Sequence, residues 1–170
     1  MPTPDVDVDA ILAALDRHDV DYVIIGGFAA ELYDVAIPPT RDIDITPSVD
    51  PENLARLADA LIELEARFRV VDGPPEGVEV PGGVTAEWLA SMLTATFTTS
   101  AGPFDICVRP AGTAGFEDLV QNRRYVSYQD YEVPVASLED VIRSKEAVGR
   151  VKDLLVIPAL RAHLRRMTPT

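Results

Sequence analysis

Residues 22–45 read YVIIGGFAAELYDVAIPPTRDIDI, and this stretch decides the fold and the site that the sequence predicts. The apolar run Tyr22–Ile25 ends at Gly26-Gly27, and a short helical segment follows. After a proline-marked loop the chain returns as Asp42-Ile43-Asp44-Ile45, which alternates polar and apolar residues. Such alternation is typical of a half-buried strand, so both aspartates face one side, about 7 Å apart. Two carboxylates so placed repel each other unless a cation lies between them, which predicts a phosphate-and-metal site.

The composition fits one globular domain. The chain has 170 residues, 47% of them hydrophobic, which is enough to bury a core. No apolar run reaches membrane-spanning length, and the opening residues MPTPDVDVD lack signal-peptide character. We therefore expect a cytoplasmic protein with no membrane partner. Cys107 is the only cysteine, which excludes an internal disulfide.

Charge is unevenly distributed along the chain. The formal net charge of −13 argues against a surface that binds nucleic acid all over. Residues 141–170 instead hold seven Arg or Lys against two acids, a net of +5. A basic C-terminal element could hold a polyanion locally, although a solvated helix face explains the same pattern.

The sequence predicts interleaved helices and strands. Helices are expected at 7–18, 48–68, 85–92, 115–122, 137–150 and 152–166, and strands at 21–25, 42–46, 69–71, 94–100, 104–108, 125–128 and 131–135. This order predicts an α/β or α+β domain with a small mixed sheet flanked by helices. We expect a single domain, 1–170, with an α/β core at 1–136 and a C-terminal helical element at 137–170.

Two local features are specific enough to test. The helix expected at 48–68 has Asp50 as its N-cap and Pro51 at its first position. The loop at 72–83 is rich in Pro and Gly and is expected to contribute nothing to the core. The apolar stripe expected on the helix comprises Leu54, Leu57, Ala58, Leu61, Ile62 and Leu64.

A third acid stands on a separate predicted strand. Asp105 lies between Phe104 and Ile106, much as Asp44 lies between two isoleucines. Taken alone, an acid in this position is more typical of a hairpin or a cap. Mg²⁺ prefers oxygen ligands and is usually bound by one or two carboxylates together with substrate phosphates. Asp42, Asp44 and Asp105 together fit a site for Mg²⁺ or Mn²⁺, in which two metals would lie roughly 3.5–4 Å apart.

Residues 26–45 resemble the signature of the polymerase-β-type minimal nucleotidyltransferases, in the form found in AbiEii-like toxins. That form has Gly-Gly, a short helix and then Thr-x-Asp-x-Asp, which Thr40, Asp42 and Asp44 match. The later strand FDICV matches the strand of the family's third carboxylate. SLEDVIRSKEAVGRVKDLLVIPAL is similar to the family's capped, lysine-bearing helix and the Arg/Lys-Asp pair after it. The matching positions there are Lys145, Arg150, Lys152 and Asp153.

The chain departs from the family pattern in one loop. Members usually carry a Gly near the end of the first helix and an Arg two residues before the Thr. Here those places fall at 34–35 and on Pro38. Arg41 is the candidate replacement for the missing arginine.

The resemblance implies transfer of a nucleoside monophosphate from an NTP, with release of pyrophosphate. Asp42 and Asp44 would bind metal, and Asp105 would complete the second metal site and act as, or orient, the base. Lys145 would contact the triphosphate as a flexible point charge. The NTP-binding set implied by the resemblance comprises Gly26, Gly27, Thr40, Arg41, Lys145, Arg150, Lys152 and Asp153.

The same resemblance implies a toxin of a toxin–antitoxin or phage-defence pair. Its acceptor would be an RNA, with the acceptor end of tRNA as the first candidate, and an antitoxin would be its protein partner. Three alternatives stay open: a small-molecule transferase of the aminoglycoside or lincosamide type, an antitoxin that nucleotidylates a protein, and a non-catalytic nucleotide-binding scaffold.

Overall fold

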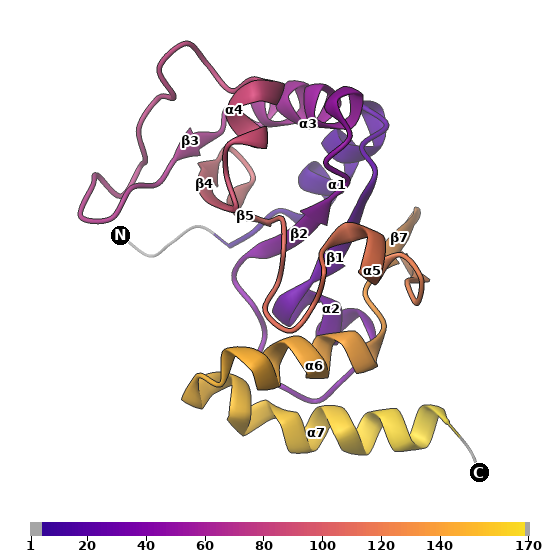
Figure 1. The fold of residues 1–170 in the computed structure, drawn as a ribbon. Coiled ribbons are helices and arrows are strands. Elements are labelled where there is room, and N and C mark those ends of the chain that lie inside the picture. The colour runs from indigo at the N-terminus through magenta and orange to yellow at the C-terminus, as the bar shows by residue number, and fades with distance from the viewer. Residues whose placement is uncertain (1–4, 169–170) are drawn as a thin grey trace.

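The computed structural model describes residues 5–168, which form one mixed sheet of seven strands with helices around it (Figure 1). The strand order is β3-β4-β5-β2-β1-β7-β6. The strands are β1 (Tyr22–Ile25), β2 (Ile43–Pro47), β3 (Arg67–Phe68), β4 (Thr94–Thr99), β5 (Gly102–Cys107), β6 (Arg124–Tyr128) and β7 (Tyr131–Val135). The helices are α1 (Val8–Arg17), α2 (Gly26–Leu32), α3 (Pro51–Glu63), α4 (Ala86–Ala90), α5 (Phe116–Leu119), α6 (Leu138–Val148) and α7 (Val151–Met167). The predicted fold class is confirmed.

The middle of the sheet carries the stretch that the sequence singled out. β1 pairs antiparallel with β2 and parallel with β7, and β2 pairs parallel with β5. Val23 and Ile24 in β1, like Ile43 and Ile45 in β2, are fully buried. Strands covered on both faces need such apolar residues, which explains the nearly continuous apolar run of β1. The pairs β4–β5 and β6–β7 form antiparallel hairpins.

The helix predicted at 48–68 has the expected N-cap but ends earlier than predicted. The Asp50 side chain accepts hydrogen bonds from the first backbone N–H groups of α3, and Pro51 is its first residue. The helix ends at Glu63 rather than 68, because Glu65 takes a left-handed φ of +53° that an α-helix does not accommodate. The following strand, β3, therefore falls at Arg67–Phe68 and not at 69–71. Ile62 is 61% exposed, so its assignment to the apolar stripe was wrong.

The region between β3 and β4 corrects one further expectation. Residues 72–83 form a loop, as predicted, but Val80 within it is buried in the core. Trp88 on α4 packs edge-to-face on Phe68, with ring centroids 5.2 Å apart. Trp88 is therefore a packing residue of the core's edge.

The C-terminal helices lie at the end of the molecule opposite α1, α3 and α4 (Figure 1). The Ser137 hydroxyl caps α6, as its sequence signature predicts, and Gly149 closes the helix with a φ of +68°. α7 continues through Pro158 without ending. The domain division at residue 136 stays a prediction. Within residues 5–168, no helix has both the length and the apolar character that crossing a membrane requires.

Candidate active site

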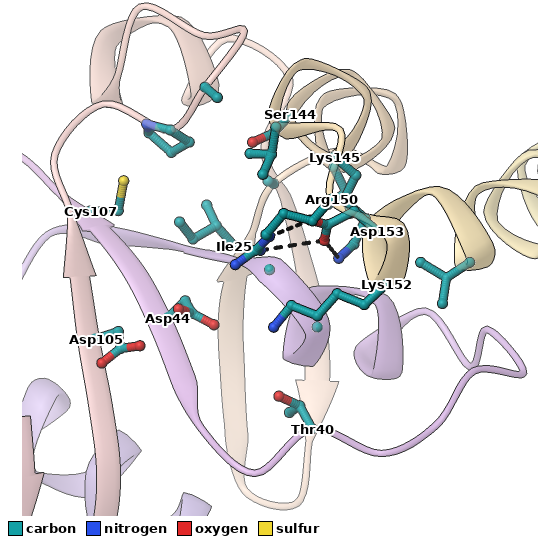
Figure 2. Close-up of a pocket in the computed structure, with 18 of the residues that line it drawn as sticks. Ile25, Thr40, Asp44, Asp105, Cys107, Ser144, Lys145, Arg150, Lys152 and Asp153 are labelled. Atoms are coloured by element: carbon teal, nitrogen blue, oxygen red, sulfur yellow. Dashed lines mark hydrogen bonds and ion pairs between the residues drawn. The ribbon is translucent and has the colours of Figure 1, made fainter. Parts of the chain in front are cut away.

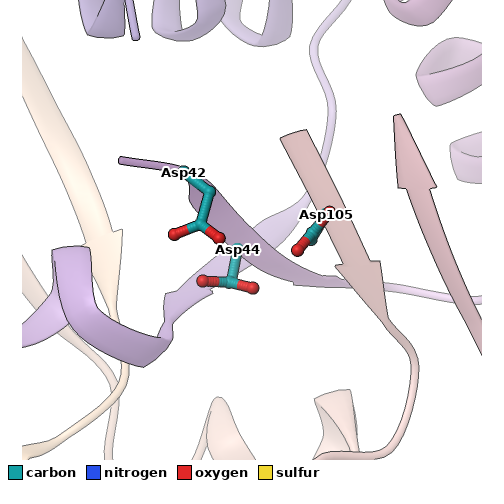
Figure 3. Close-up of side chains that lie close together, drawn as sticks. All are labelled: Asp42, Asp44 and Asp105. Carbon is teal, nitrogen blue, oxygen red and sulfur yellow. The ribbon is translucent and has the colours of Figure 1, made fainter. Parts of the chain in front are cut away.

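Three aspartates converge where β2 and β5 run side by side (Figure 3). Asp44 and Asp105 are register partners across these parallel strands, and Asp42 immediately precedes β2. One carboxylate oxygen from each residue lies within 4.8 Å of the other two. The flanking residues point to the opposite face and are buried, so the alternation turns the acids toward the cavity side; these are Ile43, Ile45, Phe104 and Ile106.

The negative charge of this cluster is only partly compensated. Burial, followed by the charges of Asp42 and Asp105, raises the pKa of Asp44 to about 7. The positive charges of Lys145 and Lys152 lower the pKa of Asp44. Burial, followed by the charge of Asp42, also raises the pKa of Asp105, whose Oδ1 is buried without a hydrogen-bond partner among the described residues. A cation between the acids would remove this repulsion.

The Gly-Gly pair makes room for the acid-bearing segment. Gly26 has a φ of +69°, and a Cβ there would lie 2.7 Å from Asp44 Oδ2. A Cβ on Gly27 would lie 3.1 Å from both Cβ and Oγ1 of Thr40. A side chain at either position would therefore displace a cavity-lining residue. Close approach of the backbone is one physical reason for glycine at these positions.

A cavity of about 570 Å³ lies between this end of the sheet, the loop after β5 and helices α6 and α7 (Figure 2). Its size falls within the range of small-molecule sites. The residues that line it include Ile25, Gly26, Gly27, Thr40, Asp42, Asp44, Asp105, Cys107, Pro110, Ala111, Thr113, Ser144, Lys145, Val148, Arg150, Lys152, Asp153 and Val156.

The structure brings the residues implied by the resemblance together, with one exception. Arg41 is exposed and does not line the cavity, so nothing here supports it as the replacement for the missing arginine. Sequence reasoning also missed part of the wall. Cys107, which stands in an apolar strand and was not among the predicted site residues, is half-buried and faces the cavity (Figure 2). The loop of Pro110, Ala111 and Thr113 carried no sequence signal, because only the tertiary fold places it beside α6.

Helices α6 and α7 contribute an ion-paired cluster. Lys145 Nζ lies 3.2 Å from Asp153 Oδ1, and Arg150 Nε lies 2.6 Å from Asp153 Oδ2 (Figure 2). Burial alone would raise the pKa of Asp153, but hydrogen bonds from Arg150 and Lys145 outweigh it and hold the pKa below its usual range. Lys152 has no such bond to Asp153 and extends from the start of α7 toward the side of Asp44 and Thr40 (Figure 2). Lys145 is therefore the lysine that pairs with Asp153.

The carboxylate cluster fits a hard divalent cation. It offers oxygen ligands only, it is partly desolvated, and the buried Asp105 Oδ1 has no donor among residues 5–168. Mg²⁺ commonly takes one or two carboxylates and leaves its other positions to water and phosphate oxygens. Asp42, Asp44 and Asp105 are therefore the residues that would hold Mg²⁺ or Mn²⁺.

The sequence matches no protein-family model and has no significant match among curated proteins. Solved structures show the fold. The lincosamide antibiotic adenylyltransferase LnuA, solved with lincomycin bound, is 17% identical with a TM-score of 0.63, and the alignment covers 94% of this chain and 99% of LnuA. The antibiotic-resistance factor ANT(2'')-Ia is 17% identical with a TM-score of 0.58, covering 95% and 82% of the two chains. TM1012 of Thermotoga maritima, a candidate nucleotidyltransferase, is 19% identical with a TM-score of 0.54, covering 94% and 91%.

These neighbours establish the class to which the fold belongs. The chain has the nucleotidyltransferase fold over nearly its whole length. The resemblance to polymerase-β-type nucleotidyltransferases is thus confirmed at the level of the fold. None of the neighbours is an AbiEii-like toxin by its description, so that branch stays a prediction.

Proposed function

We propose that this chain is a nucleotidyltransferase that moves a nucleoside monophosphate from an NTP to an acceptor hydroxyl, with Mg²⁺ or Mn²⁺ held by Asp42, Asp44 and Asp105. The observation that carries this proposal is the cluster of three carboxylates with uncompensated charge beside a cavity of about 570 Å³. When bound, the metal would offset negative charge on the attacking and leaving oxygens. The fold of the structural neighbours supports the same class of reaction, although a fold alone does not fix a function.

The residues around the cavity have distinct tasks in this reaction. The acceptor oxygen forms a bond to the α-phosphorus, the bond from that phosphorus to the bridging oxygen breaks, and pyrophosphate leaves. Asp105 takes the hydroxyl proton or orients the base that takes it, since its Oδ1 accepts no hydrogen bond within residues 5–168. Lys152 and Lys145 bring positive charge to the phosphates, as their effect on Asp44 indicates. The backbone of Gly26 and Gly27 lines the same cavity.

The acceptor that we propose is a small polar molecule. LnuA is described as a lincosamide antibiotic adenylyltransferase and ANT(2'')-Ia as an antibiotic-resistance factor, and the alignment with this chain covers 99% of LnuA. The net charge of −13 favours a neutral or cationic acceptor over a polyanion. Four of the seven C-terminal cations are also paired with acids of the same chain: Arg143 with Asp118 and Asp140, Lys145 and Arg150 with Asp153, and Arg161 with Glu146.

RNA is the second candidate acceptor. Lys152, Arg165 and Arg166 on α7 are exposed and form no salt bridge with a carboxylate within residues 5–168. These three cations leave a basic strip that could hold an RNA backbone, with binding that weakens as salt rises. A tRNA-modifying toxin with a cognate antitoxin is the biological form of this second proposal.

The test is transfer of label from each of the four NTPs, labelled at the α-phosphate, in the presence of Mg²⁺. Parallel reactions contain lincomycin, tobramycin, total tRNA, or no acceptor. We expect label in a small-molecule product and none in an otherwise identical reaction with Asp44→Asn. The Asp59→Asn variant, which changes an exposed acid on α3, is the matched control and should transfer label like the wild type.

Each other distribution of label selects a different function. Label in tRNA supports the toxin proposal, and label in protein supports protein nucleotidylation. No transfer to any acceptor, together with no NTP-dependent rise in melting temperature, contradicts the enzyme proposal and removes nucleotide binding as well. No transfer with a rise in melting temperature leaves a nucleotide-binding scaffold.

A further inference from the structure

The three carboxylates are not held in place in the same way. Asp44 and Asp105 sit inside β2 and β5, where ladder pairing on both sides fixes their backbone. Asp42 comes one residue before β2, at the end of the proline-marked loop that departs from the family pattern. Strand pairing therefore does not fix Asp42, and another contact is needed to orient its carboxylate for metal binding.

Thr40 supplies the contact that orients Asp42. The Thr40 hydroxyl donates a hydrogen bond to Asp42 Oδ1 over 2.7 Å. A donor on one carboxylate oxygen restricts rotation of the group and leaves the other oxygen for a different partner. The hydrogen bond from Thr40 therefore orients the Asp42 carboxylate, which would bind the metal. It is not itself a contact with the metal or the substrate.

Glu31 in turn fixes Thr40. The backbone N–H of Thr40 donates to Glu31 Oε1. Glu31 is half-buried in the last turn of α2, and its carboxylate draws the end of the loop back onto that helix. The start of the same helix also lies close to Thr40, since a Cβ on Gly27 would lie only 3.1 Å from Thr40 Cβ and Oγ1. Both ends of α2 therefore lie near Thr40.

We infer that Thr40 and Glu31 are positioning residues that hold Asp42 in its metal-binding orientation, an inference that rests on the proposed function. It gives Thr40 a task different from the nucleotide contact implied by the family resemblance. It also gives Glu31, which the sequence did not single out, a task in the site. Hydrogen-bond partners of metal ligands typically change metal affinity by about 10–100-fold when they are removed.

The experiment is calorimetric titration of the nucleotide-free protein with Mn²⁺. Thr40→Val keeps the shape of threonine and removes the donor, so we expect about tenfold weaker binding or worse. Thr40→Ser keeps the donor and should bind within about threefold of the wild type. Glu31→Met should weaken binding by several-fold, whereas Glu31→Gln keeps an acceptor for the Thr40 N–H and should bind more tightly than Glu31→Met.

Asp42→Asn separates failure of this inference from failure of the metal site. If Asp42→Asn loses Mn²⁺ and a folded Thr40→Val binds like the wild type, the positioning role is wrong and the metal site stands. If Thr40→Ser binds as weakly as Thr40→Val, the hydroxyl is not the cause and the inference is likewise wrong. If Asp42→Asn binds Mn²⁺ like the wild type, the proposed metal site itself is wrong. The melting temperature of each variant confirms that it is folded, and the two Glu31 variants carry the test should Thr40→Val not fold.

Discussion

The carboxylate cluster and the ion-paired cluster face each other across one cavity, and they treat buried charge in opposite ways. Asp44 is raised in pKa to about 7 by burial and then by the like charges of Asp42 and Asp105. Asp153, more deeply buried, is held by Lys145 and Arg150, and its pKa is lowered. Asp153 in the α6–α7 wall is therefore charge-balanced without a ligand, while the wall at β2 and β5 lacks a positive charge. We therefore expect a cation to bind at the wall formed by β2 and β5.

The largest expected effect comes from Asp44→Asn. Removing one of three metal ligands should lower nucleotidyl transfer by about a thousandfold or more, because the metal stabilises charge that develops in the transition state. The same variant relieves repulsion in the metal-free protein, which we expect to gain about 1–3 kcal/mol of stability. Calorimetric melting without divalent metal measures the second effect. A fall in melting temperature would contradict the claim that the cluster is uncompensated.

Asp153→Asn should have the opposite effect on stability. It leaves Lys145, only 15% exposed in its side chain, without its carboxylate partner, and breaking a buried pair in this way costs about 2–4 kcal/mol. Chemical denaturation of Asp44→Asn, Asp153→Asn and the exposed control Asp59→Asn makes the comparison directly. We expect a gain, a loss and a change within about 0.5 kcal/mol, respectively. Equal losses of stability in Asp44→Asn and Asp153→Asn would contradict the difference in charge compensation between the two walls.

The pH dependence of metal binding should report Asp44. Since the pKa of Asp44 is raised in the folded state, this group favours folding while it is protonated, and that contribution is lost as pH rises from about 4 toward 7. Metal and proton compete for the same carboxylate, so Mn²⁺ affinity should fall by up to about tenfold per pH unit below pH 7 and level off above it. Titrations between pH 5.5 and 8.5 measure this. An affinity that stays constant across the range would show that the metal does not displace a proton from Asp44.

The smallest expected effect is that of Lys152→Gln. Lys152 is exposed, forms no bond to Asp153 and lowers the pKa of Asp44 by its charge alone. Its loss should raise KM for the NTP by about three- to tenfold with little change in melting temperature, as expected for one solvated charge. Raising the salt concentration should shrink the difference from the wild type. A large loss of stability would instead show that Lys152 stabilises the fold.

The arrangement of the candidate site could be predicted from the sequence where that arrangement depends on strand periodicity. Asp44 and Asp105 could be placed because each alternates with buried residues, and that pattern survives in the paired strands β2 and β5. The N-caps Asp50 and Ser137 were predicted for a similar reason, since a cap is a local contact. Patterns of this kind involve residues that are close in the chain, so they can be recognised from the sequence.

Contacts that depend on tertiary packing were not predicted. The hydrogen bond from Thr40 to Glu31 joins the two ends of a loop, and no periodicity marks Glu31. The cavity wall after β5 exists only because α6 packs opposite it. The error at 64–68 has a backbone cause, because the left-handed residue Glu65 ends α3 where the apolar spacing continues.

The most direct test of the central claim is anomalous diffraction from crystals grown with Mn²⁺ and an NTP. The account predicts a Mn²⁺ peak in contact with carboxylate oxygens of Asp42, Asp44 and Asp105, and no such peak in Asp44→Asn crystals. A wild-type map at saturating Mn²⁺ with no metal between these residues, or with the metal bound elsewhere in the cavity, would contradict it.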